Sequence, residues 1–306
     1  MQKLAPYGSW RSPITSDMIA SETIGLEEVA FEGQDIYWIE SRPTEGGRYV
    51  IVRKGPGKDI EDIIPAPFNA RTRVHEYGGG AYTIFDRTIF FSNFADQRLY
   101  RLDPGSLPRP ITPAAELRYA DGVIDASRNR MICICEDHCI AGREAVNSIV
   151  AVDLDGEKEI TILAQGYDFY SSPRLSPDGR KLAWLSWNHP QMPWDGTELW
   201  TGELKQDGSL HAIERVAGGI SESIFQPDWS PDGLLHFVSD RTGWSNLHRW
   251  QDGQSEALTD MQAELARPPW RFGFSTYAFI APDRIICTYT QDGIWRLACL
   301  DTSSLK

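Results

Sequence analysis

The sequence has no long apolar segment, few basic residues and few cysteines. No run of apolar residues approaches the roughly 18 that a membrane-spanning helix needs, and the first residues hold no apolar core of signal-peptide length. The 43 Asp and Glu residues outnumber the 30 Lys and Arg residues, which gives a formal charge of −13. We therefore expect no nucleic acid and no membrane as partner, because both attract clustered cations.

The five cysteines are an odd number, and their spacing is not that of a disulfide framework. They are Cys133, Cys135, Cys139, Cys287 and Cys299. Reduced thiols favour a cytoplasmic location. Three of them lie near His138, which makes this the one cluster of soft metal ligands, but Cys133 and Cys135 share a face of a predicted strand and reach Cys139 only through a sharp turn. We expect buried or incidental thiols, no metal and no cofactor.

Turn chemistry repeats along the chain. Leu175–Gly179 and Trp229–Gly233 both contain Ser-Pro-Asp-Gly, and each stands between two short apolar segments. Pro sets φ, Asp binds the backbone and Gly accepts positive φ, so each predicts a tight turn between two strands. Weaker copies share this register. The six turns lie at positions 33, 86, 127, 178, 232 and 283, on average 50 residues apart.

In each of the six copies of the repeat, a third predicted strand follows the two strands that the turn joins. A shorter fourth strand follows in the first five copies. The third strands are 49–52, 99–102, 149–152, 199–201, 247–250 and 294–297. Four strands in a repeat of this length are typical of a β-propeller blade, and no long segment has the period of a helix. We expect an all-β fold, a β-propeller of four-stranded blades over residues 26–306, preceded by an N-terminal segment, residues 1–25.

The sixth copy is incomplete, because the few residues after Leu300 are too short for a loop and an outer strand. Propellers normally close their ring so that no long sheet edge stays exposed. Either the segment around Met18–Ile24 supplies the missing strand or the chain is a part of a larger protein. We favour the second alternative and expect a seven-bladed parent.

Five tryptophans fall on apolar strand positions. They are Trp38, Trp184, Trp200, Trp250 and Trp295. A buried tryptophan can contribute on the order of 200 Å² of apolar contact. We expect these five to pack between blades.

Five segments carry more specific information than the repeat. They are Tyr7–Thr15, Val74–Gly80, Trp187–Trp200, Ser239–Leu247 and Phe272–Phe279. Together they resemble the N-terminal propeller of the prolyl oligopeptidase family of serine peptidases, and within it the dipeptidyl aminopeptidase and acylaminoacyl-peptidase branch. The resemblance runs from about Pro6 to Leu300. The string from Trp187 to Trp200 is its most specific part, whereas Ser-Pro-Asp-Gly turns also occur in unrelated propellers.

The resemblance implies a C-terminal α/β-hydrolase domain with catalytic Ser, Asp and His, which this chain lacks. The nucleophile elbow Gly-x-Ser-x-Gly is also absent, since Gly219–Ser223 and Gly273–Tyr277 each lack the final Gly. We therefore expect no catalytic residue here. The resemblance implies a propeller that gates a peptidase of short peptides, an aminopeptidase or acylaminoacyl-peptidase. The alternative is a stand-alone scaffold for protein interactions; a metal-dependent propeller hydrolase ranks last, because Glu76 has little that repeats it in other blades.

The segment His75–Gly80 is a candidate substrate site. An oxyanion hole requires a nearby nucleophile elbow, which is missing. A purely structural interpretation is a glycine-rich approach to the second blade, where backbones converge. The third interpretation is that Glu76, flanked by His75 and Tyr77, presents a carboxylate at the mouth of the central tunnel and binds the ammonium group of a peptide.

A second candidate lies in the loop between the second and third strands of the fourth blade. Trp187, His189, Trp194 and Asp195 either pack this loop on the neighbouring blade or form part of the interface with the hydrolase domain. In both interpretations Trp187 and Trp194 anchor the loop, and Asp195 forms a turn that leads the chain into the following strand. The equivalent segment of the fifth blade, Asp240–Asn246, is expected to be a structural hydrogen-bonded turn.

Overall fold

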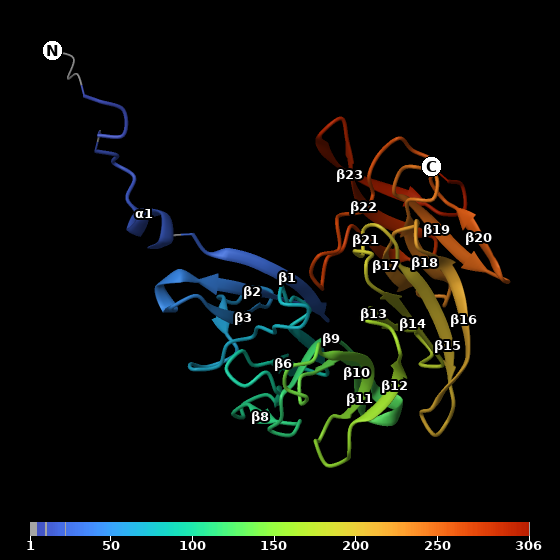
Figure 1. The fold of residues 1–306 in the computed structure, drawn as a ribbon, viewed down its shortest axis with the longest axis horizontal. Helices are drawn as coiled ribbons and strands as arrows, with labels where there is room; N and C mark the ends of the chain where they lie inside the picture. Colours follow the sequence, from blue (N-terminus) through green and yellow to red (C-terminus); the bar gives the residue numbers. More distant parts are fainter. Residues whose placement is uncertain (1–4, 10, 22, 306) are drawn as a thin grey trace. The chain divides into compact units, whose positions relative to one another are not determined.

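The computed structural model describes residues 5–9, 11–21 and 23–305. The chain divides into two compact units, Met1–Ala70 and Arg71–Lys306, which we call the N-terminal unit and the larger unit. Six separate antiparallel sheets make up these units (Figure 1). Five of them have four strands and the sixth has three, so the predicted all-β propeller architecture with an incomplete last blade is confirmed.

The N-terminal unit contains a short helix, α1 (Ser16–Ser21), and the first sheet. The described residues of Met18–Ile24 therefore form no strand, and the alternative in which this segment supplies one is wrong; Glu22 lies outside the described residues. The strands pair in chain order, with the 3-10 turn η1 (Pro43–Glu45) after the second. They are β1 (Gly25–Glu32), β2 (Asp35–Arg42), β3 (Arg48–Lys54) and β4 (Glu61–Asp62).

The larger unit contains the other five sheets, each paired in chain order. The second and third sheets are β5 (Tyr82–Phe85), β6 (Thr88–Ser92), β7 (Leu99–Leu102), β8 (Arg109–Pro110), and β9 (Leu117–Asp125), β10 (Arg130–Asp137), β11 (Val146–Asp153), β12 (Thr161–Gln165), with the 3-10 turn η2 (Ala126–Arg128). The fourth and fifth are β13 (Phe169–Leu175), β14 (Lys181–Trp187), β15 (Glu198–Leu204), β16 (Leu210–Gly218), and β17 (Ile224–Trp229), β18 (Leu235–Ser239), β19 (Asn246–Gln251), β20 (Gln254–Ala257). The sixth is β21 (Tyr277–Ala281), β22 (Arg284–Gln291) and β23 (Ile294–Asp301).

All six predicted turns join the first and second strands of a sheet. The two Ser-Pro-Asp-Gly turns have the same hydrogen bonds: Ser176 Oγ and Ser230 Oγ each donate to the following Asp carboxylate and each accept a backbone N–H from beyond the glycine. Gly179 and Gly233 have φ of 69° and 87°, as the turn requires. Local side-chain chemistry thus sets the position of these turns.

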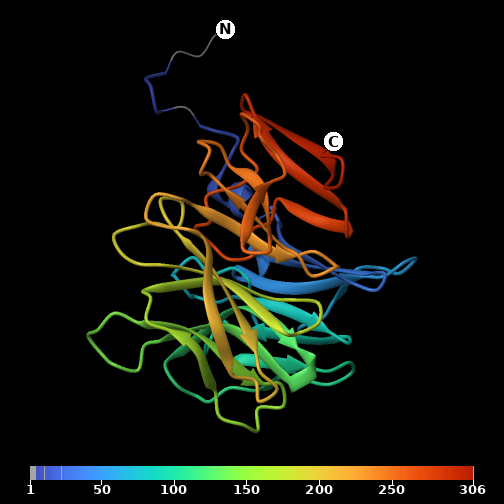
Figure 2. The same ribbon diagram turned by 90° about the vertical axis from the view of Figure 1, so that its right-hand side faces the viewer.

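Neighbouring sheets of the larger unit pack face to face in chain order, from green to red in Figures 1 and 2. Cys133 and Cys135 lie in the apolar cluster between the second and third sheets, as expected of buried thiols. Trp184 is buried in the next cluster, while Trp200 and Trp250 are half-buried against such clusters. In the N-terminal unit Trp38 is half-buried.

Trp295 contradicts the expectation for the tryptophans, because its side chain is 53% exposed. On β23 it shares a face with Leu297, whereas Ala298 and Leu300 on the other face pack toward the fifth sheet. Ile286 extends the exposed row across β22. One face of the sixth sheet therefore exposes large apolar side chains to solvent.

Candidate functional site

The connections of the larger unit separate into two groups. Because neighbouring strands are antiparallel, loops between second and third strands leave a sheet at the same end as the links from one sheet to the next. We call this the loop end, and the opposite one the turn end. Both predicted site segments lie at the loop end: His75–Gly80 precedes β5, and residues 188–197 join β14 to β15. A third segment, residues 258–276, precedes β21 at the same end.

Gly78, Gly79 and Gly80 hold the first segment in place. All three have positive φ, and a Cβ on any of them would meet backbone within 3 Å. At Gly79 this backbone is the carbonyl oxygen of Phe272, only 2.3 Å from the ideal Cβ position, and the two residues form a parallel bridge. The structural interpretation of the glycine run, an approach of converging backbones, is confirmed.

His75 is a packing residue in this arrangement. Its ring contacts Phe169 and Trp187 edge-on, with centroids 5.2 and 5.6 Å away, and lies tilted on Phe272 at 4.8 Å. Burial lowers the pKa of the imidazole to about 4, although the charge of Glu136 opposes this shift. The ring is therefore neutral near pH 7, while the backbone N–H of His75 donates to Glu136 Oε1 at 3.1 Å.

Glu76 and Tyr77 point into solvent from the same turn. Glu76 belongs to the connection before β5 and not to an inner strand, and its side chain is 78% exposed. Its Oε1 accepts a hydrogen bond from Arg118 Nη1 at 3.0 Å, and the same nitrogen contacts Glu136 Oε2 at 3.3 Å. Tyr77 is exposed and meets Trp270 edge-on at 5.4 Å. A carboxylate is thus present at the loop end, already paired with a guanidinium.

The loop after β14 is held both by aromatic packing and by a hydrogen bond from Ser223 Oγ to the Pro193 carbonyl at 3.0 Å. Trp187 is buried and stacks on Phe169 with centroids 5.4 Å apart, and His189 meets the same ring edge-on at 5.0 Å. Asp195 Oδ2 accepts a backbone N–H within the loop, which closes its turn. Trp194 is 41% exposed.

The equivalent loop of the fifth sheet is a hydrogen-bonded turn, as expected. Asp240 Oδ1 accepts the N–H of Ser223 at 2.8 Å, and its backbone carbonyl accepts the N–H of Gly243 at 2.8 Å. Arg241 pairs with Glu222. These groups fix the conformation of the loop.

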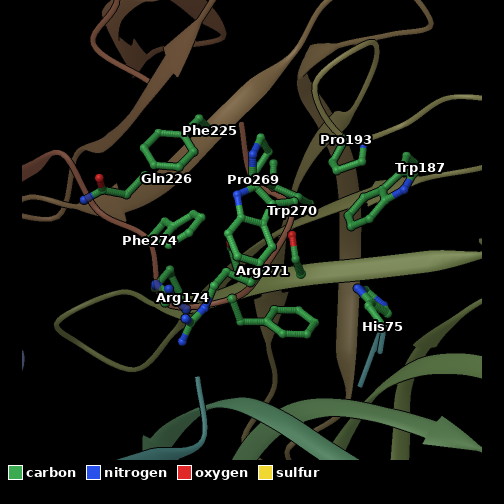
Figure 3. Close-up of a pocket in the computed structure, with 15 residues that line it drawn as sticks. His75, Arg174, Trp187, Pro193, Phe225, Gln226, Pro269, Trp270, Arg271 and Phe274 are labelled. Atoms are coloured by element: carbon green, nitrogen blue, oxygen red, sulfur yellow. The ribbon is translucent and has the colours of Figure 1, made fainter. Parts of the chain in front are cut away.

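A small pocket of about 30 Å³ opens between these segments (Figure 3). Trp187 and Pro193 line it from the loop after β14, and Trp270 and Arg271 from the segment before β21. In the view of Figure 3 the indole of Trp270 stands between Trp187 on one side and Phe274 on the other. Sequence reasoning missed the segment before β21, although its run Arg-Pro-Pro-Trp-Arg-Phe, residues 267–272, is an unusual concentration of cationic and aromatic side chains.

Inner-strand residues line the same pocket. Arg174 of β13 reaches Asp121 of β9, with Nη1 3.0 Å from Oδ1, and Asp121 Oδ2 accepts the N–H of Ser172 at 2.7 Å. Asp228 of β17 lies close enough for its charge to act on Arg174, and burial raises the pKa of the Asp228 carboxyl. Carboxylates thus do recur on inner strands of different sheets, which the sequence pattern did not reveal.

Exposed large apolar side chains gather at the loop end of the larger unit. They are Tyr77, Ile140, Met192, Trp194, Ile220, Trp244 and Trp270. Among the described residues, connections at the turn end expose only Leu107 and Leu305 in this class. A concentration of exposed apolar side chains at one end is consistent with a docking surface for another domain or protein.

Two further observations concern ligands and membranes. Over residues 5–9, 11–21 and 23–305, no three His, Cys, Asp or Glu side chains come together in a way that could hold a metal ion. Within the same residues, no helix has the length and apolar character needed to cross a membrane.

The chain has relatives among proteins of known structure. No protein-family profile and no curated protein matches the chain. Among solved structures, a puromycin hydrolase is 37% identical over 99% of this chain, with a TM-score of 0.91. A puromycin-hydrolysing peptidase of Mycobacterium tuberculosis gives the same identity and TM-score over the entire chain. Prolyl oligopeptidase B of Galerina marginata is 11% identical with a TM-score of 0.65 over 93% of the chain, which shows a shared fold.

The matched region is only a part of each of these proteins. The chain spans 49% of the length of both puromycin-hydrolysing proteins and 43% of the oligopeptidase. The relationship predicted from the sequence is thereby confirmed: the chain matches the propeller portion of peptidases of the prolyl oligopeptidase family.

Proposed function

We propose that this chain is the gating and substrate-positioning propeller of a serine peptidase that cleaves short peptides, acting as an aminopeptidase or acylaminoacyl-peptidase. The observation that carries the proposal is the match, over essentially the whole chain, to about half of each puromycin-hydrolysing protein. The other half of the parent would be a C-terminal α/β-hydrolase domain of the same polypeptide. That domain would supply the nucleophile and its base, since this chain has no nucleophile elbow.

The loop end of the larger unit is the surface on which we place the hydrolase domain. Trp194 is exposed there, in the same loop as His189 and Asp195. Trp187, at the start of the loop, is buried and stacks on Phe169. Ile220 is 80% exposed on the neighbouring connection. An apolar group of this size gains about 1.5–3 kcal/mol when it becomes buried, so a few such contacts suffice to hold a covalently tethered domain.

The exposed face of the sixth sheet supports a seven-bladed parent. Trp295 and Leu297 lie on this face, opposite the face that packs on the fifth sheet. The first sheet, considered by itself, also exposes a row of apolar residues, with Leu26 and Phe31 on β1. A seventh blade following residue 306 would cover the exposed face of the sixth sheet. The free thiols Cys133, Cys135 and Cys287 are buried, which fits a reducing cytoplasm.

Glu76 is our candidate for contact with the substrate's amino group, with His75 and Tyr77 holding its turn. Its carboxylate is exposed at the loop end, where a peptide would approach the hydrolase domain. The ion pair with Arg118 orients the carboxylate and leaves its second oxygen for an ammonium ion. An aminopeptidase needs such a contact to distinguish a free amino terminus from a blocked one.

The test compares the longer polypeptide with the chain 1–306 on short chromogenic peptides. We expect activity only in the longer polypeptide, and a fall in kcat/KM of about tenfold or more for Ile220→Asp, because docking would bury the new charge. Leu107→Asp is the matched control, since Leu107 is similarly exposed (77%) at the turn end. Absence of peptidase activity, or equal effects of the two variants, would overturn the proposal and favour a scaffold.

The same assay tests Glu76. The variant Glu76→Gln in the longer polypeptide should reduce kcat/KM for free-amine peptides more than for N-blocked ones. Glu157→Gln, an exposed carboxylate of the turn end, is the control. An unchanged ratio between the two substrates would remove Glu76 from the site.

A further inference from the structure

The larger unit has a second pocket, of about 430 Å³, which borders the last strand of the sixth sheet and which we call the edge pocket. Its lining is mostly apolar. Ala298 and Leu300 line it from β23, and Leu305 lines it from the turn after β23. Leu258 and Met261 line it from the segment after β20. Protein interiors contain few voids larger than a water molecule, so an apolar space of this size beside two packed sheets has room for large side chains from elsewhere.

The strand that borders the edge pocket is unpaired on one side. Among the described strands, β23 pairs only with β22, whereas the third strand of each of the other five sheets pairs on both sides. A sheet edge presents a row of backbone N–H and C=O groups with which a further strand can pair. A strand paired with this edge would lie directly beside the edge pocket.

The backbone after β23 repeats the geometry that leads to an outer strand in two other sheets. The N–H of Thr302 donates to the carbonyl of Asp283, the residue before β22, at 2.8 Å. The equivalent hydrogen bonds of the third and fourth sheets join Leu154 to Asn129 at 3.1 Å and Leu204 to Arg180 at 2.7 Å. In those sheets the chain then turns and enters the outer strands β12 and β16.

Asp301 bends the chain back after β23. Its Oδ1 accepts the N–H groups of Ser303 and Ser304 at 3.0 and 2.8 Å, and its carbonyl accepts the N–H of Leu305 at 2.8 Å. Leu305 is the last residue that the structure describes, and it lines the edge pocket. The chain is therefore already at the edge pocket when it reaches residue 305.

An apolar residue at a fixed distance after this hydrogen bond packs on the preceding sheet. Ile160 lies six residues after Leu154 and packs on the cluster between the second and third sheets. Leu210 lies six residues after Leu204 and packs on the cluster between the third and fourth sheets. The same distance from Thr302 leads to residue 308. The cluster that this residue would meet, between the fifth and sixth sheets, includes residues that line the edge pocket.

We propose that the segment following residue 306 is the outer strand of the sixth sheet, which pairs antiparallel with β23 and inserts a large apolar side chain of residue 308 into the edge pocket. The inference rests on that part of the proposed function in which the polypeptide continues after residue 306, and it does not depend on peptidase activity. This strand completes the sixth blade before the seventh begins and removes the free edge of β23.

Hydrogen exchange in the chain 1–306 and in the longer polypeptide tests the pairing. We expect the β23 amides that point away from β22 to exchange about 100-fold more slowly in the longer polypeptide, because they become hydrogen-bonded. The amides on the outer edge of β20 are the internal control, since they should exchange equally in both proteins. Equal exchange of the β23 amides in the two proteins would overturn the inference.

The filling of the edge pocket is tested by Leu305→Asp. This variant should lower the unfolding temperature of the longer polypeptide by several degrees and leave that of the chain 1–306 unchanged, because only the added strand would bury the new charge. Leu107→Asp is the matched control, an exposed leucine of another turn-end connection, and should change neither. Equal effects of the two variants in the longer polypeptide, or a charged residue or glycine at position 308, would overturn the inference.

The alternative occupant of the β23 edge is a second copy of the chain. In that case the β23 amides would be protected in the chain 1–306 itself, and sedimentation would show dimers. This result would overturn the inference.

The longer polypeptide also separates this inference from the proposed function. Protected β23 amides in a longer polypeptide without peptidase activity would refute the function and leave the strand. Peptidase activity with unprotected β23 amides would refute the strand and leave the function.

Discussion

Replacing Gly79 by alanine should damage the larger unit far more than the same change at a glycine of equal conformation. Gly79 has φ of 88°, and Gly233 in a Ser-Pro-Asp-Gly turn has φ of 87°. An alanine costs about 1–2 kcal/mol in this left-handed region at either position. At Gly233 the new methyl group meets nothing within 4 Å, so this backbone term is the whole effect.

At Gly79 the methyl group would lie 2.3 Å from the carbonyl oxygen of Phe272, so the segment before β21 must move. Moving it strains close packing, at about 1–3 kcal/mol, and weakens the hydrogen bond from Phe272 N–H to the Gly78 carbonyl, at about 0.5–1.5 kcal/mol. We expect Gly79→Ala to lose about 2–4 kcal/mol more than Gly233→Ala.

Urea unfolding of the two variants and the parent chain, followed by tryptophan fluorescence, measures this difference. At about 2–4 °C per kcal/mol, thermal unfolding should separate them by roughly 5–15 °C. Equal losses would show that the glycine run serves only backbone conformation, and the argument that Gly79 is required by close approach would then be refuted.

Two further predictions concern pH and the sixth sheet. Burial lowers the pKa of His236 and His248 to about 4, below the 6.5 of an unfolded histidine. The folded state therefore binds fewer protons than the unfolded state in this pH range. Each residue should cost roughly 2–4 kcal/mol of stability as the pH falls from about 6.5 to 4. Urea unfolding at pH 7 and 4.5 should show that the free energy of unfolding depends less on pH in His236→Asn than in the parent chain. Leu297→Asp should lower the unfolding temperature of the longer polypeptide by several degrees but not that of the chain 1–306, because only a seventh blade would bury the new charge. The control is Ile213→Asp on the outer strand β16, which should change neither unfolding temperature. Equal effects of the two variants in the longer polypeptide would contradict a seventh blade.

The sheets were predictable because the signals that define them are local. A Ser-Pro-Asp-Gly turn contains its own hydrogen-bonding partners, and the apolar strands beside it need no information from elsewhere in the chain. The exposure of Trp295 was not predictable, since an apolar position on a strand becomes core only when another sheet covers it.

The pocket was missed because the inner strands beside it have irregular backbone. Asp121, Ser172 and Gln226 have positive φ of 55°, 55° and 46°, and each lies at a break in register of an innermost strand. Such a bulge turns one side chain out of the alternating pattern on which sequence reasoning depends. The three residues differ in type, so no motif in the sequence marks the position they share.

These bulges also join neighbouring sheets. Asp121 accepts the N–H of Ser172 from the next inner strand, and the amide of Gln226 accepts the N–H of Thr276 and donates to the carbonyl of Tyr277. Ser172 and Gln226 also line the pocket, so substituting either changes the joint between sheets together with any ligand contact.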